Sequence, residues 1–93
     1  MFLDRTAIAH GAILKADVCI VGGGAAGITL ARTLAASSVD VLLLEGGEAE
    51  ATARSQELYS GHMETVYRAR ERDGDYLTDT RLRFFGGSTN HWR

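Results

Sequence analysis

Three glycines, Gly22, Gly24 and Gly27, follow one another with the spacing Gly-x-Gly-x-x-Gly. In such a loop the first glycine permits a tight turn, the second lets a phosphate approach the backbone, and the third lets a helix pack closely on a strand. An anion held there lies at the N-terminus of the following helix, where unpaired amides and the helix dipole favour negative charge. We therefore expect a pyrophosphate site formed by this glycine loop and the adjoining Ala26.

Glu45 is the next residue that could do chemistry. It ends an apolar run that comes after the glycine loop in the sequence. A carboxylate in that place can accept hydrogen bonds from ribose hydroxyls, and it would repel a 2'-phosphate. The pair of features predicts a dinucleotide site that disfavours NADP. The residues alone leave NAD and FAD open, and a glycine turn without a ligand is the competing structural interpretation.

The elements that would position these residues are a strand, a helix and a second strand. Residues 17–21 form an apolar run typical of a strand buried on both faces of a parallel sheet, in which we expect Cys19 to be a small core residue. Residues 25–36 are good helix formers, and residues 39–44 form a second apolar strand. Residues 18–45 come close to the roughly 30 residues of a βαβ unit with parallel strands.

The region after the second strand is polar. Residues 48–59 begin with acidic residues and favour a surface helix. Residues 64–75 mix both charge signs, which indicates a solvated segment rather than a phosphate-binding patch. His10 and His62 stand alone in polar surroundings and receive no role.

Length and composition exclude several classes of protein. The chain has 93 residues, of which 45% are hydrophobic and 24% charged, the balance of one small globular domain. A net charge of -2 gives no field that favours nucleic acid. A single cysteine and the lack of zinc-ligand spacing predict no metal site.

No targeting or membrane segment is evident. Charged side chains interrupt residues 1–16, so the chain shows no secretory signal, and we expect a cytoplasmic location. The longest apolar stretch, residues 18–30, is shorter than the roughly 20 residues that span a bilayer.

Two sequence segments resemble one known family. Residues 17–27, Asp-Val-Cys-Ile-Val-Gly-Gly-Gly-Ala-Ala-Gly, and residues 42–47, Leu-Leu-Leu-Glu-Gly-Gly, resemble the FAD-binding start of the glucose-methanol-choline (GMC) oxidoreductases. Residues 81–92, Arg-Leu-Arg-Phe-Phe-Gly-Gly-Ser-Thr-Asn-His-Trp, are similar to that family's second signature, a Gly-Gly-Ser/Thr loop that lies along the flavin. The resemblance thus favours FAD over NAD.

The resemblance implies roles for individual residues. The glycine loop would hold the FAD pyrophosphate and Glu45 the adenosine ribose. The flavin end would be contacted by residues of the second signature, namely Gly87, Ser88, Asn90 and His91. The family passes hydride from a CH–OH donor, such as an alcohol, sugar or polyol, to the flavin. No catalytic residue is assigned within this chain.

His91 carries a further implication of the resemblance. A histidine at this position is the pattern of the family's sugar-oxidising and choline-oxidising branches. The resemblance therefore favours a sugar or polyol donor. Family members with histidyl-linked FAD carry their histidine at the same offset from the glycine pair, so His91 is a candidate for covalent attachment. Trp92 could stack on a ligand or anchor the loop.

The resemblance extends over residues 16–93 and covers only the beginning of the family. We expect residues 1–15 to be a lead-in and residues 16–93 to be the N-terminal part of a truncated FAD-binding domain without its substrate domain. The expected fold is α/β, an incomplete Rossmann-like βαβ unit. The alternative is a stand-alone or remnant nucleotide-binding module without catalysis, with NAD among its candidate ligands.

Overall fold

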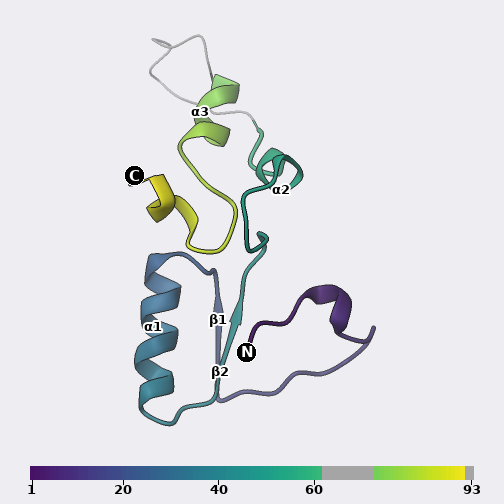
Figure 1. Cartoon of the computed structure of the whole chain (residues 1–93), viewed down its shortest axis with the longest axis vertical. Coiled ribbons are helices and arrows are strands. Elements are labelled where there is room, and N and C mark those ends of the chain that lie inside the picture. The colour runs from purple at the N-terminus through teal and green to yellow at the C-terminus, as the bar shows by residue number, and fades with distance from the viewer. Residues whose placement is uncertain (62–72, 92–93) are drawn as a thin grey trace.

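The computed structural model describes residues 1–61 and 73–91. Within these ranges one helix of 12 residues packs beside a two-stranded parallel sheet, and the shorter helices lie away from it (Figure 1). The elements are η1 (Arg5–Ala7), β1 (Val18–Val21), α1 (Ala25–Ala36), β2 (Val41–Leu44), α2 (Ala53–Glu57), α3 (Asp73–Asp79) and η2 (Gly87–His91), where η marks a 3₁₀ helix.

The central unit is β1, α1 and β2. The two strands are parallel neighbours, with Val18 opposite Val41 and Val21 opposite Leu44. The helix that connects them lies alongside both strands (Figure 1). A helical crossover between parallel strands is a βαβ unit, so the expected α/β class and Rossmann-like unit are confirmed, and α1 has the predicted bounds.

Both strands begin slightly later than the apolar runs predict. The backbone N–H groups of Asp17 and Val18 donate to the Asp40 carbonyl at 2.9 and 3.1 Å, and the Asp40 N–H donates to the Asp17 carboxylate at 3.0 Å. These bonds close the N-terminal edge of the sheet. At the far end of α1, Ser38 has a φ of 60°, a left-handed conformation in which a helix cannot continue.

The sheet is covered on one face only in the described part of the chain. Ile20 is its one buried apolar side chain and lies against Gly27 of α1, whereas Cys19 and Val21, its neighbours in β1, are exposed. Successive side chains of a strand point to opposite faces, so α1 shields the Ile20 face and leaves the other open. The predictions of a strand buried on both faces and of Cys19 as a core residue are therefore wrong.

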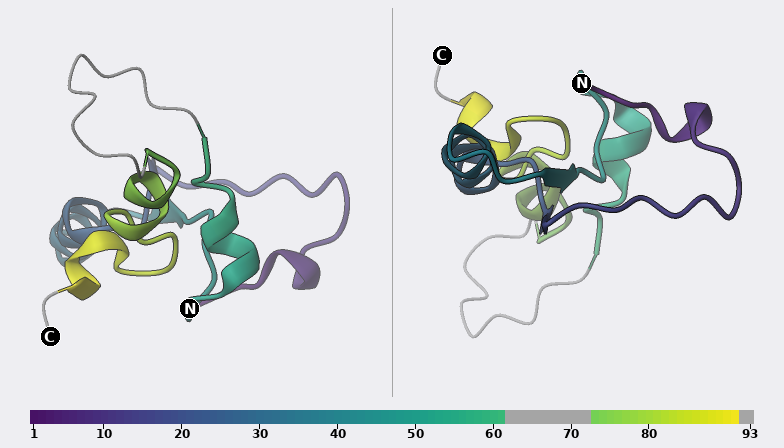
Figure 2. Two further views of the ribbon diagram at one scale, coloured as in Figure 1. Left: turned by 90° about the horizontal axis from the view of Figure 1, so that it is seen from above. Right: turned by 90° about the horizontal axis from the view of Figure 1, so that it is seen from below.

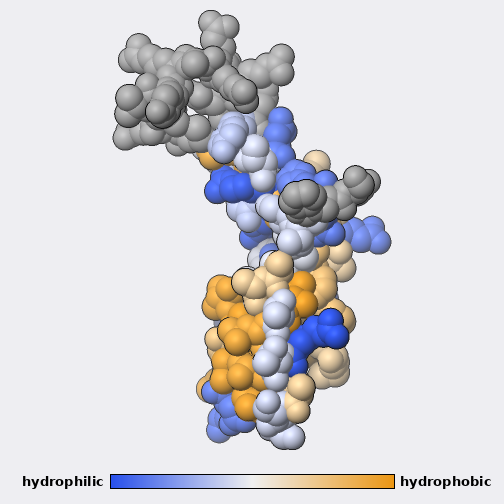
Figure 3. Space-filling view, turned by 90° about the vertical axis from the view of Figure 1, so that its left-hand side faces the viewer, coloured by the Kyte–Doolittle hydropathy of each residue, from blue (hydrophilic) through white to orange (hydrophobic). Residues whose placement is uncertain are grey.

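The outer side of α1 carries both apolar and polar side chains. Figure 3 shows the side of the molecule that carries this helix, with apolar surface and a paler, more polar stripe over the βαβ unit. Leu30 is 48% exposed, and Thr29, Arg32 and Thr33 of the same helix are exposed as well. The helix therefore turns polar groups to water, as surface helices usually do, and leaves Leu30 uncovered beside them.

The predicted surface helix over residues 48–59 is wrong in extent. Glu48 pairs with Phe84 in a parallel bridge, which holds it in an extended conformation. Helix starts only at Ala53, because the Thr52 hydroxyl accepts a hydrogen bond from the Ser55 N–H at 3.2 Å and caps α2. The segment predicted to be solvated, residues 64–75, falls largely outside the described residues.

The lead-in and the end of the chain flank the central unit. In the three ribbon views the lead-in lies on the opposite side of the strands from α1 (Figures 1 and 2). Asp4 caps η1, accepting from the Thr6 N–H at 2.8 Å. The Phe2 ring meets the Phe85 ring edge to face, with centroids 5.3 Å apart, so the start of the chain contacts the segment that precedes η2.

Candidate functional site

The glycine loop lies between the end of β1 and the start of α1. Gly22 has a φ of 109°, which side chains rarely allow, and its N–H donates to the Leu44 carbonyl at 2.7 Å. A Cβ on Gly27 would lie 1.9 Å from the Gly22 carbonyl oxygen. The tight turn and the close helix packing both require glycine here, for the reasons that the spacing predicts.

Gly24, unlike Gly27, has no packing contact among the described residues that requires a glycine. It is the N-cap of α1, has extended backbone with φ -78° and ψ -177°, and makes no side-chain capping bond. A Cβ on Gly24 would meet no atom of residues 1–61 and 73–91 within 4 Å. The first turn of α1 carries Ala26, which is exposed. The first amides of a helix have no acceptor within the helix, so the open space beside Gly24 suits an anion such as a pyrophosphate.

The Glu45 carboxylate joins the two βα connections. It is half-buried, and its two oxygens accept from the Gly23 N–H at 2.6 Å and from the Gly47 N–H at 2.7 Å. A carboxylate offers about four lone-pair sites, so two backbone bonds leave it able to accept from hydroxyls as well. Sequence reasoning did not foresee this bond to the glycine loop.

The second glycine loop, residues 84–87, crosses the carboxyl ends of both strands. Its Phe85 N–H donates to the Glu48 carbonyl at 2.9 Å and its Gly86 N–H to the Gly23 carbonyl at 2.8 Å. A Cβ on Gly87 would lie 3.5 Å from the Gly24 Cα. Ligands of open α/β sheets bind outside the carboxyl ends of the strands. Two motifs that are far apart in the sequence therefore meet at the edge where a dinucleotide is expected.

The polar residues after this loop bond within it. The Ser88 hydroxyl accepts from the Leu82 N–H at 3.2 Å. The Asn90 side-chain amide donates to the carbonyls of Phe85 and Gly87 at 3.3 and 3.0 Å. His91 is exposed at the end of η2. Of the residues expected at a flavin end, Ser88 and Asn90 thus shape the loop, and Trp92 lies outside the described residues.

Sequence reasoning missed the residues that hold this loop in place. The Ser55 hydroxyl and the Gln56 amide, both in α2, bond to the backbone of Arg83. They come from a polar stretch without a recognisable motif, and only their tertiary contacts distinguish them from other surface residues. Arg83 lies within the second signature, but the spacing of that signature gave no reason to expect a contact between Arg83 and α2.

Residues 1–61 and 73–91 offer neither a cluster of metal ligands nor a helix that could span a membrane. Those residues contain no group of three or more His, Cys, Asp or Glu side chains that could hold a metal ion. They also form no helix of the length and apolar character needed to cross a membrane.

Comparison with known proteins agrees with this geometry. The family model of FAD dependent oxidoreductases matches residues 17–93, a range that includes both glycine loops and Glu45. No curated protein and no solved structure matched the chain. FAD has a pyrophosphate and a ribose, the two groups that suit the open N-terminus of α1 and a carboxylate acceptor at the end of β2. Since the match covers most of its length, the chain belongs to the FAD dependent oxidoreductase family.

Proposed function

We propose that this chain forms the dinucleotide-binding part of a GMC-type oxidoreductase that oxidises a CH–OH donor. The family match supports an FAD-binding oxidoreductase. The narrower assignment is supported by the second signature in residues 81–92 and by its place beside the first glycine loop. Residues 16–93 would be the N-terminal part of the FAD-binding domain, and residues 1–15 a lead-in.

The observation that carries the proposal is the meeting of the two glycine loops. The Gly86 N–H bonds to the Gly23 carbonyl at 2.8 Å, and a Cβ on Gly24 would enter open space beside them. A single extended cofactor can therefore contact both loops. We assign the pyrophosphate to Gly22, Gly24, Ala26 and Gly27, the adenosine ribose to Glu45, and the flavin end to Gly87, Ser88, Asn90 and His91.

The work of this chain is to bind and orient the cofactor. Bound FAD would supply an isoalloxazine ring that accepts hydride from the donor. The amides at the N-terminus of α1 would balance the phosphate charge. Glu45 would accept from the ribose hydroxyls while its bonds to Gly23 and Gly47 hold the first glycine loop beside the turn after β2. No group of this chain is assigned to proton transfer.

His91 is proposed as a contact of the flavin ring and as its candidate attachment point. Its exposure at the end of η2 leaves the imidazole accessible. Attachment would join an imidazole nitrogen of His91 to the flavin 8α carbon. Acid precipitation of the complete protein tests the link: covalent flavin stays in the pellet, and flavin found wholly in the supernatant contradicts it.

The cofactor assignment is tested by titrating the complete, flavin-free protein with FAD and with NAD. We expect FAD to bind and Glu45→Ala to weaken its affinity by about 1.5 to 3 kcal/mol, because the ribose loses a charged acceptor. Glu48→Ala is the matched control, since Glu48 is a nearby exposed acid that contributes its backbone to the second loop. Preferential binding of NAD would instead favour a nucleotide-binding module.

The donor class is tested by anaerobic mixing of the flavin-loaded protein with alcohols, sugars, polyols and amines. We expect bleaching of the flavin absorbance by members of the first three groups. Bleaching by amines alone would overturn the CH–OH assignment while leaving membership of the FAD dependent oxidoreductase family intact.

A further inference from the structure

The second glycine loop depends on α2 for its position. Ser55 of α2 is only 4% exposed, and it is the one buried polar side chain within residues 1–61 and 73–91 whose burial is described. Its hydroxyl donates to the Arg83 carbonyl and accepts from the Arg83 guanidinium, each at 2.9 Å. A buried hydroxyl with both hydrogen-bonding functions used fixes its partner in one place.

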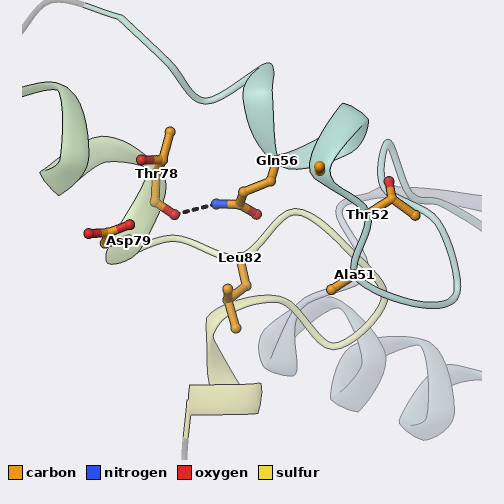
Figure 4. Close-up of a pocket in the computed structure, with 7 residues that line it drawn as sticks. Ala51, Thr52, Gln56, Thr78, Asp79 and Leu82 are labelled. Atoms are coloured by element: carbon orange, nitrogen blue, oxygen red, sulfur yellow. Dashed lines mark hydrogen bonds between the residues drawn. The ribbon is translucent and has the colours of Figure 1, made fainter.

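Gln56 holds the same segment from the next position of α2. Its side-chain oxygen accepts from the Arg83 N–H at 3.0 Å, and its side-chain nitrogen donates to the carbonyls of Thr78 and Arg81. Figure 4 shows this amide reaching from α2 towards Thr78 across an open pocket of about 450 Å³ that Leu82 also lines. We call Ser55 and Gln56 together the α2 clamp.

The clamp lies next to the proposed cofactor contacts in the chain. A Cβ on Gly47 would lie 2.5 Å from the Arg83 carbonyl oxygen, so the clamped residue rests on the turn after β2. The following residues pair in turn with Glu48 and with Gly24, through Phe84 and Gly86. A change at Arg83 is therefore passed on to the Gly86–Gly87 pair within a few residues, whereas the first glycine loop is held separately by β1, α1 and Glu45.

We propose that Ser55 and Gln56 are positioning residues, which place the flavin-end loop against the pyrophosphate loop and thereby set the affinity and environment of the flavin ring. This inference rests on the proposed function. If the clamp acts in this way, its loss weakens binding of the flavin half of FAD and leaves binding of the adenosine diphosphate half unchanged. If Ser55 and Gln56 only stabilised the fold, both halves would bind more weakly.

The experiment compares ADP and FAD as ligands of the complete, flavin-free protein. The variants are Ser55→Ala, which removes the hydroxyl, and Gln56→Met, which removes both amide functions at similar length. Gln56→Glu keeps an acceptor for the Arg83 N–H and should be less severe. Glu57→Met is the matched control, because Glu57 is the next residue of α2 and is exposed.

We expect Ser55→Ala and Gln56→Met to weaken FAD binding about fivefold to tenfold, the equivalent of one lost hydrogen bond. ADP binding should stay within about twofold on the same scale. The visible circular dichroism of bound flavin should change in these two variants and not in Glu57→Met. Urea unfolding of each variant shows whether it folds. If Ser55→Ala does not fold, Gln56→Met alone tests the proposal.

Three results overturn the inference, two by contradicting the clamp and one by contradicting the function on which it rests. Equal losses of ADP and FAD affinity, or unchanged FAD affinity and flavin dichroism in both variants, contradict the clamp and leave the proposed function standing. A parent protein that binds neither ADP nor FAD contradicts the proposed function and removes the basis of the clamp with it.

Discussion

The two glycine loops meet at one edge of the sheet but are held there by different contacts. The first, residues 22–24, is continuous with β1 and α1; its Gly22 and Gly23 N–H groups bond to Leu44 and Glu45 at the end of β2, and only its Gly23 carbonyl bonds to the second loop. The second, residues 84–87, belongs to no strand of the described residues and is held by isolated bridges to Gly24 and Glu48 and by side chains of α2. One loop is thus part of a repeating backbone pattern, and the other depends on individual side chains.

This difference explains why the loops should respond differently to substitution. A clash inside the βαβ unit disturbs a helix and two strands together, because their packing is shared. A clash at the second loop disturbs a segment that local hydrogen bonds hold, and such regions can open without global unfolding. The four predictions below are ordered from the largest expected effect to the smallest.

Gly27→Ala should be the most damaging change. The new Cβ would lie 1.9 Å from the Gly22 carbonyl oxygen, so α1 must move away from β1. We expect at least about 3 kcal/mol of destabilisation, the upper part of the range for overpacking, together with loss of flavin. Urea unfolding of the complete protein measures this. Gly61→Ala is the control, since among the described residues its Cβ would meet only Leu77, at an ordinary 3.5 Å. Equal stability of the two variants would contradict the shared packing.

Gly47→Ala should act on the second loop. Its Cβ would lie 2.5 Å from the Arg83 carbonyl oxygen and from the Phe84 Cα, so the Glu48–Phe84 pairing must separate. We expect a cost of about 1 to 3 kcal/mol and a changed flavin fluorescence. Hydrogen exchange should show the Phe85 amide losing protection while the amides of β1 and β2 keep theirs. Loss of protection throughout the sheet would mean that the loops are not held separately.

Gly24→Ala should separate binding from folding. Its Cβ meets nothing within 4 Å in the part of the chain that the structure describes, so the fold should tolerate it with a cost below about 1 kcal/mol, that of a poorer N-cap. If the pyrophosphate lies there, FAD affinity should fall at least about tenfold, or 1.4 kcal/mol. Titration with FAD measures the affinity, and urea unfolding measures the stability of the same variant. Unchanged FAD affinity would place the pyrophosphate elsewhere.

The smallest effect is expected at the exposed cap of η1 in the lead-in, rather than at the contact of Phe2 with Phe85 of the second glycine loop. The Thr6 hydroxyl and N–H donate to the Asp4 carboxylate and hold its pKa below the usual value of 3.8. Because the folded pKa is the lower one, the capping contribution is present above pH 3.8 and is lost as the pH falls through the folded value. The Thr6 amide resonance should follow this titration, and Asp4→Asn should abolish it without changing flavin content at neutral pH. Lower flavin content would tie the lead-in to the site.

The sequence predicted the central unit well because its signals are local. The apolar run that contains Ile20, the helix formers that follow it and the glycines between them each indicate one conformation through backbone preferences. The same reasoning failed for Cys19, because a strand's composition does not show how many of its faces are covered. It also overextended the helix around Ala53, because the pairing of Glu48 with Phe84 outweighs the preference of a polar segment for helix.

What the sequence determined by itself is the βαβ unit and the presence of two glycine-rich loops, since strand, helix and turn follow from residue type and spacing over a few positions. Only the tertiary structure decided that Gly86 bonds to Gly23, that the Glu45 carboxylate bridges Gly23 and Gly47, and that Ser55 and Gln56 hold the second loop. Apart from the bond between Glu45 and Gly47, these contacts join residues more than 20 positions apart. They form only when packing brings the polar groups together, and composition or periodicity carries no signal for that.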